Sequence, residues 1–138
     1  MSGTSVTIDD VRRAHERIRS GIQRSPCPDS LPLSAATGMN VACKLDLLQR
    51  TGSFKERGAR NALLLLDAAA RARGVVAASA GNHALGLAYH GGLLGIPVTV
   101  VMPRFAPLVK VATCRRLGAR VRLEGETVAD ARRHAAEI

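Results

Sequence analysis

Short apolar segments and helical patterns alternate through residues 74–138, and this alternation constrains the fold more than any other feature of the sequence. The segments GVVAAS, IPVTVVMP and ARVRLEG predict strands at residues 74–79, 96–103 and 119–125. The segments that follow them predict helices at residues 82–95, 106–118 and 128–138. Strands that alternate with helices across short connections predict a parallel sheet with helices on both faces. We therefore expect a three-layer α/β fold.

The first part of the chain is less regular. Apolar residues spaced three and four apart predict an amphipathic helix at about residues 8–22, capped by Thr7. Three prolines among residues 24–33 predict an irregular segment. The stretch NVACKLD, residues 40–46, is a predicted strand.

A lysine stands where a further helix is expected to begin. Ser53, followed three residues later by Glu56, matches a capping box and predicts a helix at about residues 54–72. Lys55 would then lie in the first turn, where the helix dipole disfavours a cation. Lys55 is therefore either an exposed lysine that tolerates the dipole or a nucleophile that is needed as the neutral amine.

The composition excludes several classes of protein. No apolar run is long enough to span a membrane, and the N-terminus is charged where a signal peptide would be apolar, so we expect a cytoplasmic protein without a membrane partner. The three cysteines lack metal or redox spacing, and we expect no metal site. The net charge of +9 comes with only three aromatic residues, so we expect a solvated arginine-rich surface and no nucleic-acid partner.

Two loops of small residues are predicted to lead into helices. They are TGSFK, residues 51–55, and SAGNH, residues 79–83. In open parallel sheets, ligands bind on the loops that lead from the carboxyl ends of strands into helices. The unpaired backbone N–H groups of a helix N-terminus favour anions. We expect these two loops to form a ligand site.

The same two loops carry a resemblance to a known family. KLDLLQRTGSFKERGARNAL, residues 44–63, and ASAGNHALGLA, residues 78–88, resemble the fold-type II pyridoxal-phosphate enzymes, and most of all the threonine dehydratases (threonine ammonia-lyases) and serine racemases. The likeness extends over about residues 25–137. It implies a tryptophan synthase beta-like fold and pyridoxal 5'-phosphate as the cofactor. It also implies that Lys55 is the Schiff-base lysine.

The resemblance assigns roles to further residues. Phe54 would pack beside the pyridine ring, unless it is an ordinary core residue. Asn82 would bond the 3-hydroxyl group of the cofactor and could also cap a helix. Ser79, Gly81, Asn82 and His83 would surround the substrate carboxylate. His83 could instead only order the loop. The other histidines are expected to be structural or exposed.

The reaction that the resemblance implies is the elimination of water and ammonia from a hydroxyamino acid. The Lys55 amine would remove the α-proton while the cofactor acts as electron sink. Threonine would give 2-oxobutanoate and ammonia, as in isoleucine biosynthesis, and serine would give pyruvate. Ala80 stands where serine racemases of the family have a serine base, which favours dehydration. His83 after Asn82 argues against cysteine synthases and threonine synthases.

The resemblance covers only the N-terminal portion of a longer family chain. It implies that residues 1–50 belong to the larger cofactor domain and residues 51–138 to a smaller α/β domain that is truncated at its C-terminus. The glycine-rich loop that binds the cofactor phosphate comes later in the family. We expect this incomplete chain to be inactive alone, or to be a non-catalytic fragment or split-gene remnant that binds the cofactor or a partner. Full-length members are homo-oligomeric.

Overall fold

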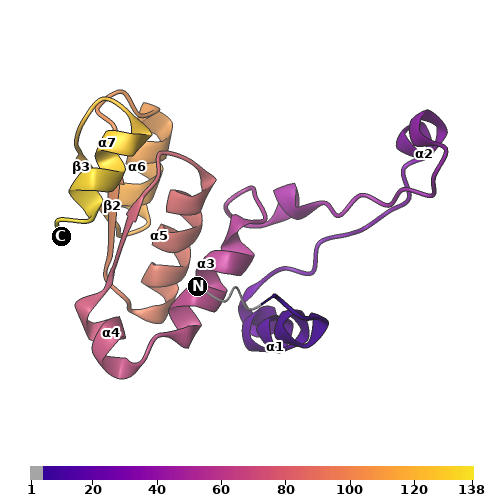
Figure 1. Cartoon of the computed structure of the whole chain (residues 1–138), viewed down its shortest axis with the longest axis horizontal. Coiled ribbons are helices and arrows are strands. Elements are labelled where there is room, and N and C mark those ends of the chain that lie inside the picture. The colour runs from indigo at the N-terminus through magenta and orange to yellow at the C-terminus, as the bar shows by residue number, and fades with distance from the viewer. Residues whose placement is uncertain (1–4) are drawn as a thin grey trace.

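Among residues 5–138, which the computed structural model describes, three parallel strands form one sheet (Figure 1). They are β1 (Val75–Ala78), β2 (Val98–Met102) and β3 (Arg120–Leu123). The strands lie in the order β1-β2-β3, with Val76 opposite Thr99 and Val100 opposite Val121. The predicted parallel α/β architecture is confirmed.

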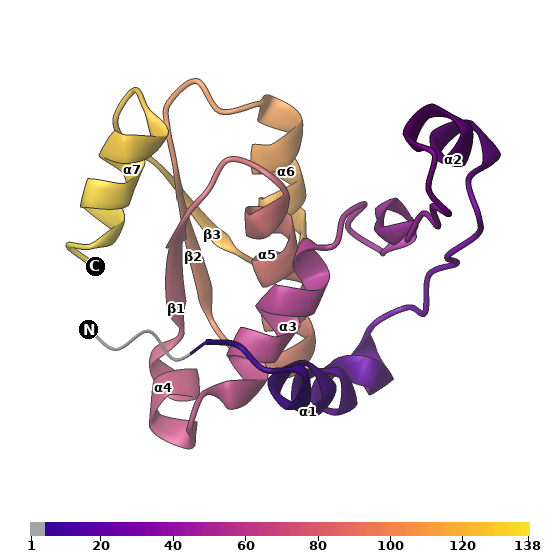
Figure 2. The same cartoon turned by 45° about the vertical axis from the view of Figure 1, so that its right-hand side comes forward.

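Helices cover both faces of the sheet. α5 (Asn82–Leu94) and α6 (Leu108–Arg116) pack on one face, and α7 (Val128–Ala135) packs against β1 and β2 on the other (Figure 2). α7 begins with a capping box, in which Asp130 donates its N–H to Thr127 Oγ1 at 3.1 Å and accepts the Thr127 N–H at 2.9 Å. The three predicted layers are thus confirmed.

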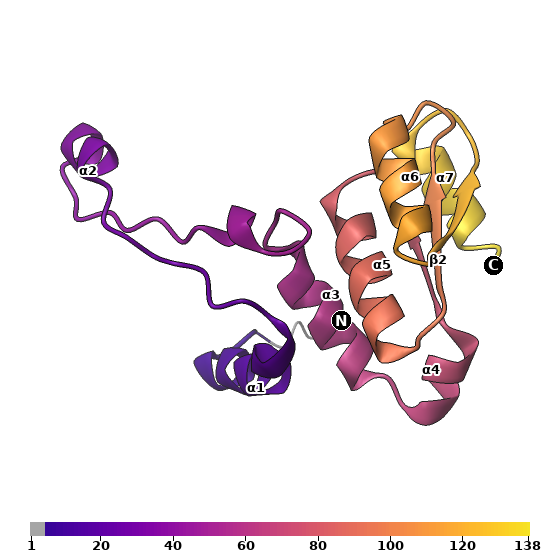
Figure 3. The same ribbon diagram turned by 180° about the vertical axis from the view of Figure 1, so that it is seen from behind.

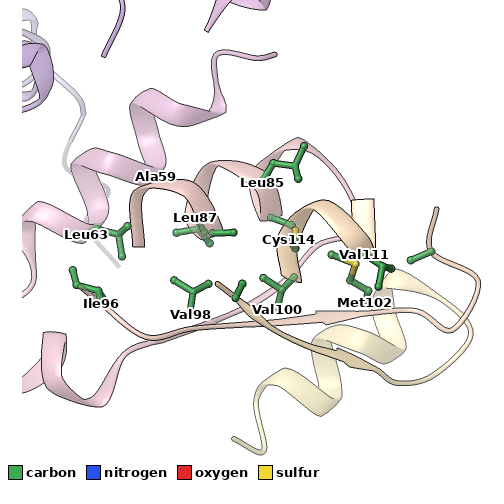
Figure 4. Packing of buried hydrophobic residues seen from close by; sticks show 14 residues of the cluster. Ala59, Leu63, Leu85, Leu87, Ile96, Val98, Val100, Met102, Val111 and Cys114 are labelled. Carbon is green, nitrogen blue, oxygen red and sulfur yellow. The ribbon is translucent and has the colours of Figure 1, made fainter. Parts of the chain in front are cut away.

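The core lies between β2 and the helices on its face. Val98, Val100 and Met102 point from β2 toward α5 and α6 (Figure 4). Val101, which alternates with them, is also fully buried. A strand that is buried on both faces reads as a continuous apolar run in the sequence. This is why β2 could be predicted without alternation of apolar and polar residues.

The single helix predicted at residues 54–72 is wrong, because two helices occupy this stretch. α3 (Lys55–Leu65) packs against α5, and α4 (Ala68–Arg73) follows after a break. Asp67 causes the break by accepting a hydrogen bond from the Ala70 N–H at 2.7 Å. Aspartate at this position starts a new helix instead of continuing the old one.

The N-terminal helix is close to its prediction. α1 (Ile8–Ile18) packs against α3, and its last residue is buried. Thr7 caps it as predicted, with Oγ1 accepting the Asp10 N–H at 3.2 Å. A 3-10 turn, η1 (Arg19–Gly21), replaces the last predicted helical turn.

Residues 22–49 leave the α/β body as an extended arm (Figures 1 and 3). The short helix α2 (Leu31–Thr37) lies at its tip, and a 3-10 turn, η2 (Asp46–Leu48), lies on its return to the body. Large apolar side chains are exposed along the arm, namely Leu31, Leu33, Met39, Leu47 and Leu48. Within the described range, no helix has both the length and the hydropathy needed to cross a membrane.

The strand predicted at residues 40–46 is wrong, and two prolines explain why. Backbone N–H groups of this segment donate to the carbonyl oxygens of Pro26 and Pro28, at 3.0 and 2.8 Å. Proline has no N–H with which to return these bonds. Among the described residues, only the Ser30 N–H returns a bond, to the Val41 carbonyl oxygen at 2.8 Å, and regular pairing reduces to an isolated bridge at Ala42.

Two leucines on α3 test the contribution of the core to stability. Leu63 is 1% exposed and Leu65 is 61% exposed. We expect Leu63→Ala to lower the free energy of unfolding by about 2–5 kcal/mol, because it removes buried methyl groups and leaves a cavity. Leu65→Ala should change it by about 0.5 kcal/mol or less. Urea denaturation measures both, and equal losses would contradict the packing of α3 on α5.

Candidate functional site

The start of α3 and the start of α5 meet at an open cavity of about 340 Å³. Its walls are formed by Phe54, Lys55, Gly58, Ala59 and His83. The structure therefore brings residues of the two predicted loops together. Three other predicted site residues, Ser79, Gly81 and Asn82, lie in the second loop but outside these walls.

Lys55 is the first residue of α3 and presents its amine at this cavity. Its Nζ atom lies 4.8 Å from the centroid of the Phe54 ring, within the range of a cation–π contact. Phe54 is 60% exposed, so its interpretation as a core residue is wrong. Across residues 5–138, no carboxylate forms an ion pair with the Lys55 amine. The amine is therefore available to a ligand.

The capping box predicted from Ser53 and Glu56 is wrong. Phe54 is the cap residue of α3 and makes no side-chain cap bond. Ser53 Oγ accepts the Lys55 N–H at 3.3 Å, whereas Glu56 reaches past Ser53 and accepts the Thr51 N–H. Glu56 is fully buried, so its carboxylate turns inward toward α5 instead of lying along the surface.

The first turn of α3 is pressed against α5 at Gly86. A Cβ on Gly86 would lie 3.2 Å from the Lys55 carbonyl oxygen and 3.3 Å from the Glu56 nitrogen. These neighbours are backbone atoms, which cannot rotate away as a flexible side chain can. A larger residue would require the first turn of α3 to shift by a few tenths of an ångström, so glycine favours this close approach.

The second loop has a local geometry of its own. Ser79 Oγ accepts the Gly81 N–H at 3.3 Å, and α5 begins at Asn82. The interpretation of Asn82 as a helix cap is wrong, because Gly81 is the cap residue and no side chain caps this helix. Asn82 Oδ1 instead accepts a hydrogen bond from Lys110 Nζ at 3.0 Å. The substrate-binding roles of these loop residues stay predictions.

His83 lines the cavity, and the pKa of its ring is lowered. Desolvation by its surroundings lowers the pKa of the imidazole from its usual value of 6.5, although the residue as a whole is exposed. The positive charge of Lys55 nearby lowers the pKa of His83 further. His83 is therefore neutral at neutral pH and can both donate and accept a hydrogen bond.

A larger hollow of about 1180 Å³ lies elsewhere, between α1 and the arm. None of the predicted site residues lines it. Among its charged groups, Arg19 and Arg57 pair with carboxylates, and Lys44 donates to a backbone carbonyl. The hydrogen bond from Arg57 lowers the pKa of Asp46 to about 2. Despite its size, this hollow lacks an available reactive group of the kind that Lys55 supplies.

The sequence interpretation missed three residues that support the site. Glu56, Gly86 and His90 lie where α3 and α5 meet, and all are buried. The sequence assigned Glu56 to a capping box and His90 to a structural or exposed position, and it did not predict that the two side chains meet. The available signal was a histidine in the otherwise apolar helix NHALGLAYHGGLL, because a buried polar side chain needs a polar neighbour.

Comparisons with known proteins match most of the chain to relatives. The sequence profile of the family described as pyridoxal-phosphate dependent enzyme matches residues 18–138. The chain is 48% identical over 120 residues to L-threonine ammonia-lyase of Thermotoga maritima. The aligned region covers 87% of this chain and 30% of that protein. It is 52% identical over 112 residues to L-threo-3-hydroxyaspartate ammonia-lyase of a Pseudomonas species, covering 81% of this chain and 35% of that protein.

A solved structure also matches this chain over nearly its whole length. Serine racemase from Dictyostelium discoideum superimposes with a TM-score of 0.88 at 34% sequence identity. The match covers 97% of this chain and 44% of that chain. The sequence thus spans less than half the length of the relatives that it matches.

Two glycines test the contact beneath Lys55. A Cβ added at Gly58 on α3 would meet nothing within 4 Å, whereas one added at Gly86 would meet backbone atoms. We expect Gly58→Ala to raise the free energy of unfolding by about 0.5–1 kcal/mol, because alanine is the better helix former. Gly86→Ala should lower it, because the added methyl group pushes α3 away. Chemical denaturation of both variants decides, and a gain for Gly86→Ala would show that the helices can separate freely.

The pKa of His83 tests whether its ring lies close to the Lys55 amine. We expect the ring of His83 to titrate below 6.5 in an NMR pH series. Lys55→Ala should raise this pKa only in part, because desolvation is the larger cause and remains. Lys44→Ala, which removes a lysine outside the cavity walls, should leave it unchanged. An unchanged His83 pKa in Lys55→Ala would place the two side chains too far apart to interact.

Proposed function

The chain belongs to the pyridoxal-phosphate dependent enzymes, and on this premise we propose that it is part of an ammonia-lyase that acts on a 3-hydroxy amino acid such as threonine. The observation that carries the proposal is the amine of Lys55, which faces an open cavity without a carboxylate partner among residues 5–138. A lysine amine in such a place can attack an aldehyde.

The other lysines of the chain are less available than Lys55. Lys44 donates to the carbonyl oxygen of Ser25 at 2.6 Å, and Lys110 donates to Asn82 Oδ1 at 3.0 Å. An amine that is held in a hydrogen bond must first give up that bond before it reacts. The Lys55 amine makes no such hydrogen bond within the described chain, and this favours Lys55 as the reactive lysine.

The residues at the cavity fit the aldehyde end and the ring of pyridoxal phosphate. Bound there, pyridoxal phosphate supplies an aldehyde for an amine and a ring that accepts electrons from the α-carbon of an amino acid. Lys55 would hold the aldehyde carbon, and the exposed Phe54 ring would lie beside the pyridine ring. Once its amine is released, Lys55 would take the α-proton. The amide of Asn82 would bond the ring hydroxyl after it releases Lys110.

The second loop would bind the substrate carboxylate. Ser79, Gly81 and His83 stand at the N-terminus of α5, where backbone N–H groups and the helix dipole favour an anion. Ala80 has no group that could return a proton to the opposite face of the α-carbon, which favours elimination over racemisation. Two relatives are named for threonine and for 3-hydroxyaspartate. Both of these amino acids carry a β-hydroxyl group, which would be the leaving group.

The arm supports a proposal on domains. Residues 1–50 would belong to a larger domain and residues 51–138 to a smaller one, although residues 1–4 lie outside the described part of the chain. Leu31 is 82% exposed and Leu47 is 66% exposed, and such side chains are usually covered by a partner surface. We propose further that the enzyme is cytoplasmic, and that it is homo-oligomeric as the family resemblance implies.

A non-catalytic role in cofactor binding is the second candidate. It needs only the Lys55 amine at the cavity, and none of the loop residues that would bind a substrate. Release of 2-oxobutanoate from threonine by the chain with added pyridoxal phosphate would exclude this candidate.

Trapping with borohydride tests the reactive lysine. We expect a Schiff-base absorption band when the chain is mixed with pyridoxal phosphate, because the Lys55 amine is available. After reduction, peptide mapping by mass spectrometry should find the adduct mainly on Lys55. Lys55→Ala should lose the band, whereas the matched variant Lys44→Ala should keep it. Equal labelling of Lys44, Lys55 and Lys110 would contradict the proposed function.

A further inference from the structure

A carboxylate and an imidazole are buried together beneath the candidate site, between α3 and α5. The side chains of Glu56 and His90 both have 0% exposure, and Glu56 Oε2 lies 3.4 Å from His90 Nε2. Neither atom forms a hydrogen bond with another group of the described chain, so the two side chains meet by proximity. Neither residue lines the cavity, and the proposed function leaves both without a role.

Glu56 fixes the loop that precedes Lys55. Its second oxygen, Oε1, accepts the backbone N–H of Thr51, which lies five residues earlier. This bond ties the beginning of the loop to the first turn of the helix that the loop enters. The carboxylate also lies at the N-terminus of α3, where the helix dipole favours a negative charge.

Several charged groups face His90. Glu56 and Arg60 approach from α3, and Arg50 approaches from the arm end of the loop. Burial is the main effect and lowers the pKa of His90 below 6.5, while the Glu56 charge acts in the opposite direction. Tyr89 packs edge-on at 5.0 Å between ring centroids. The imidazole is therefore neutral at neutral pH.

α5 meets the first turn of α3 at two points. Gly86 touches the peptide bond between Lys55 and Glu56, and His90 lies one helical turn further along the same face of α5. A buried polar pair of this kind is weak evidence for stability, because apolar residues of similar volume are often neutral or stabilising in place of a buried ion pair. A role in geometry is the better account of this pair.

We propose that Glu56 and His90 are positioning residues for Lys55, which hold the loop of residues 51–54 and the first turn of α3 on α5. Glu56 links the Thr51 N–H to the His90 ring, and α5 in turn carries His83 to the same cavity. The two loops of the site thereby keep fixed positions relative to each other. This inference rests on the proposed function, because it takes the Lys55 amine as the reactive group.

The first test replaces the pair by apolar residues of similar size. The double variant Glu56→Leu/His90→Leu should remain folded, with a melting temperature equal to or above that of the wild type. The ratio of pyridoxal phosphate trapped on Lys55 to that trapped on Lys44 should fall several-fold. The single variant Glu56→Gln can still accept the Thr51 N–H, so its ratio should stay close to that of the wild type. Leu63→Ala, a destabilised control, should leave the ratio unchanged.

The second test uses the wild-type chain without any cofactor. Hydrogen exchange of the Thr51 amide should be slow, because its N–H is bonded to a buried carboxylate. Exchange at the rate of an unstructured peptide would overturn the proposal even if the double variant failed to fold. An unchanged Lys55 ratio in a folded double variant would overturn it as well. Absence of preferential Lys55 labelling in the wild type would instead reject the proposed function.

Discussion

The close contact between α3 and α5 at Gly86 is the constraint on which the candidate site depends. Strand β2 holds α5 through the buried side chains between them, and α5 holds the peptide bond that follows Lys55. The position of the reactive amine is thus set by the core through one helix. Glu56 and His90 add a polar contact to the same interface. The sheet, the helix and the lysine form one continuous series of packed contacts.

Where packing dominates, the fold could be predicted from local patterns. The runs that became β1 and β2 are apolar because they are buried, and the Thr127 cap is a local signal that tertiary structure did not override. The prediction failed where a second group competed. Asp67 divided a helical pattern, and Pro26 and Pro28 withheld the N–H groups that a strand at residues 40–46 would need.

The candidate site could be located but not built from the sequence. Lys55 and His83 were predicted from their loops and do line one cavity, because both loops lead into helices that pack together. The orientation of Glu56 could not be predicted, because capping-box spacing describes a surface carboxylate and this one turns inward. Its contact with His90 depends on how α5 lies on α3, which no local pattern encodes.

The sparse backbone pairing within the arm has a consequence for how the molecule responds to stress. Opening the pairing at Pro26 and Pro28 breaks few bonds and exposes no part of the core. The two segments of the arm can therefore separate from each other while the sheet and its helices stay folded, as a separate unit of local unfolding. A thermal melt that reports on the core would not register this event, whereas a protease would meet the opened arm first.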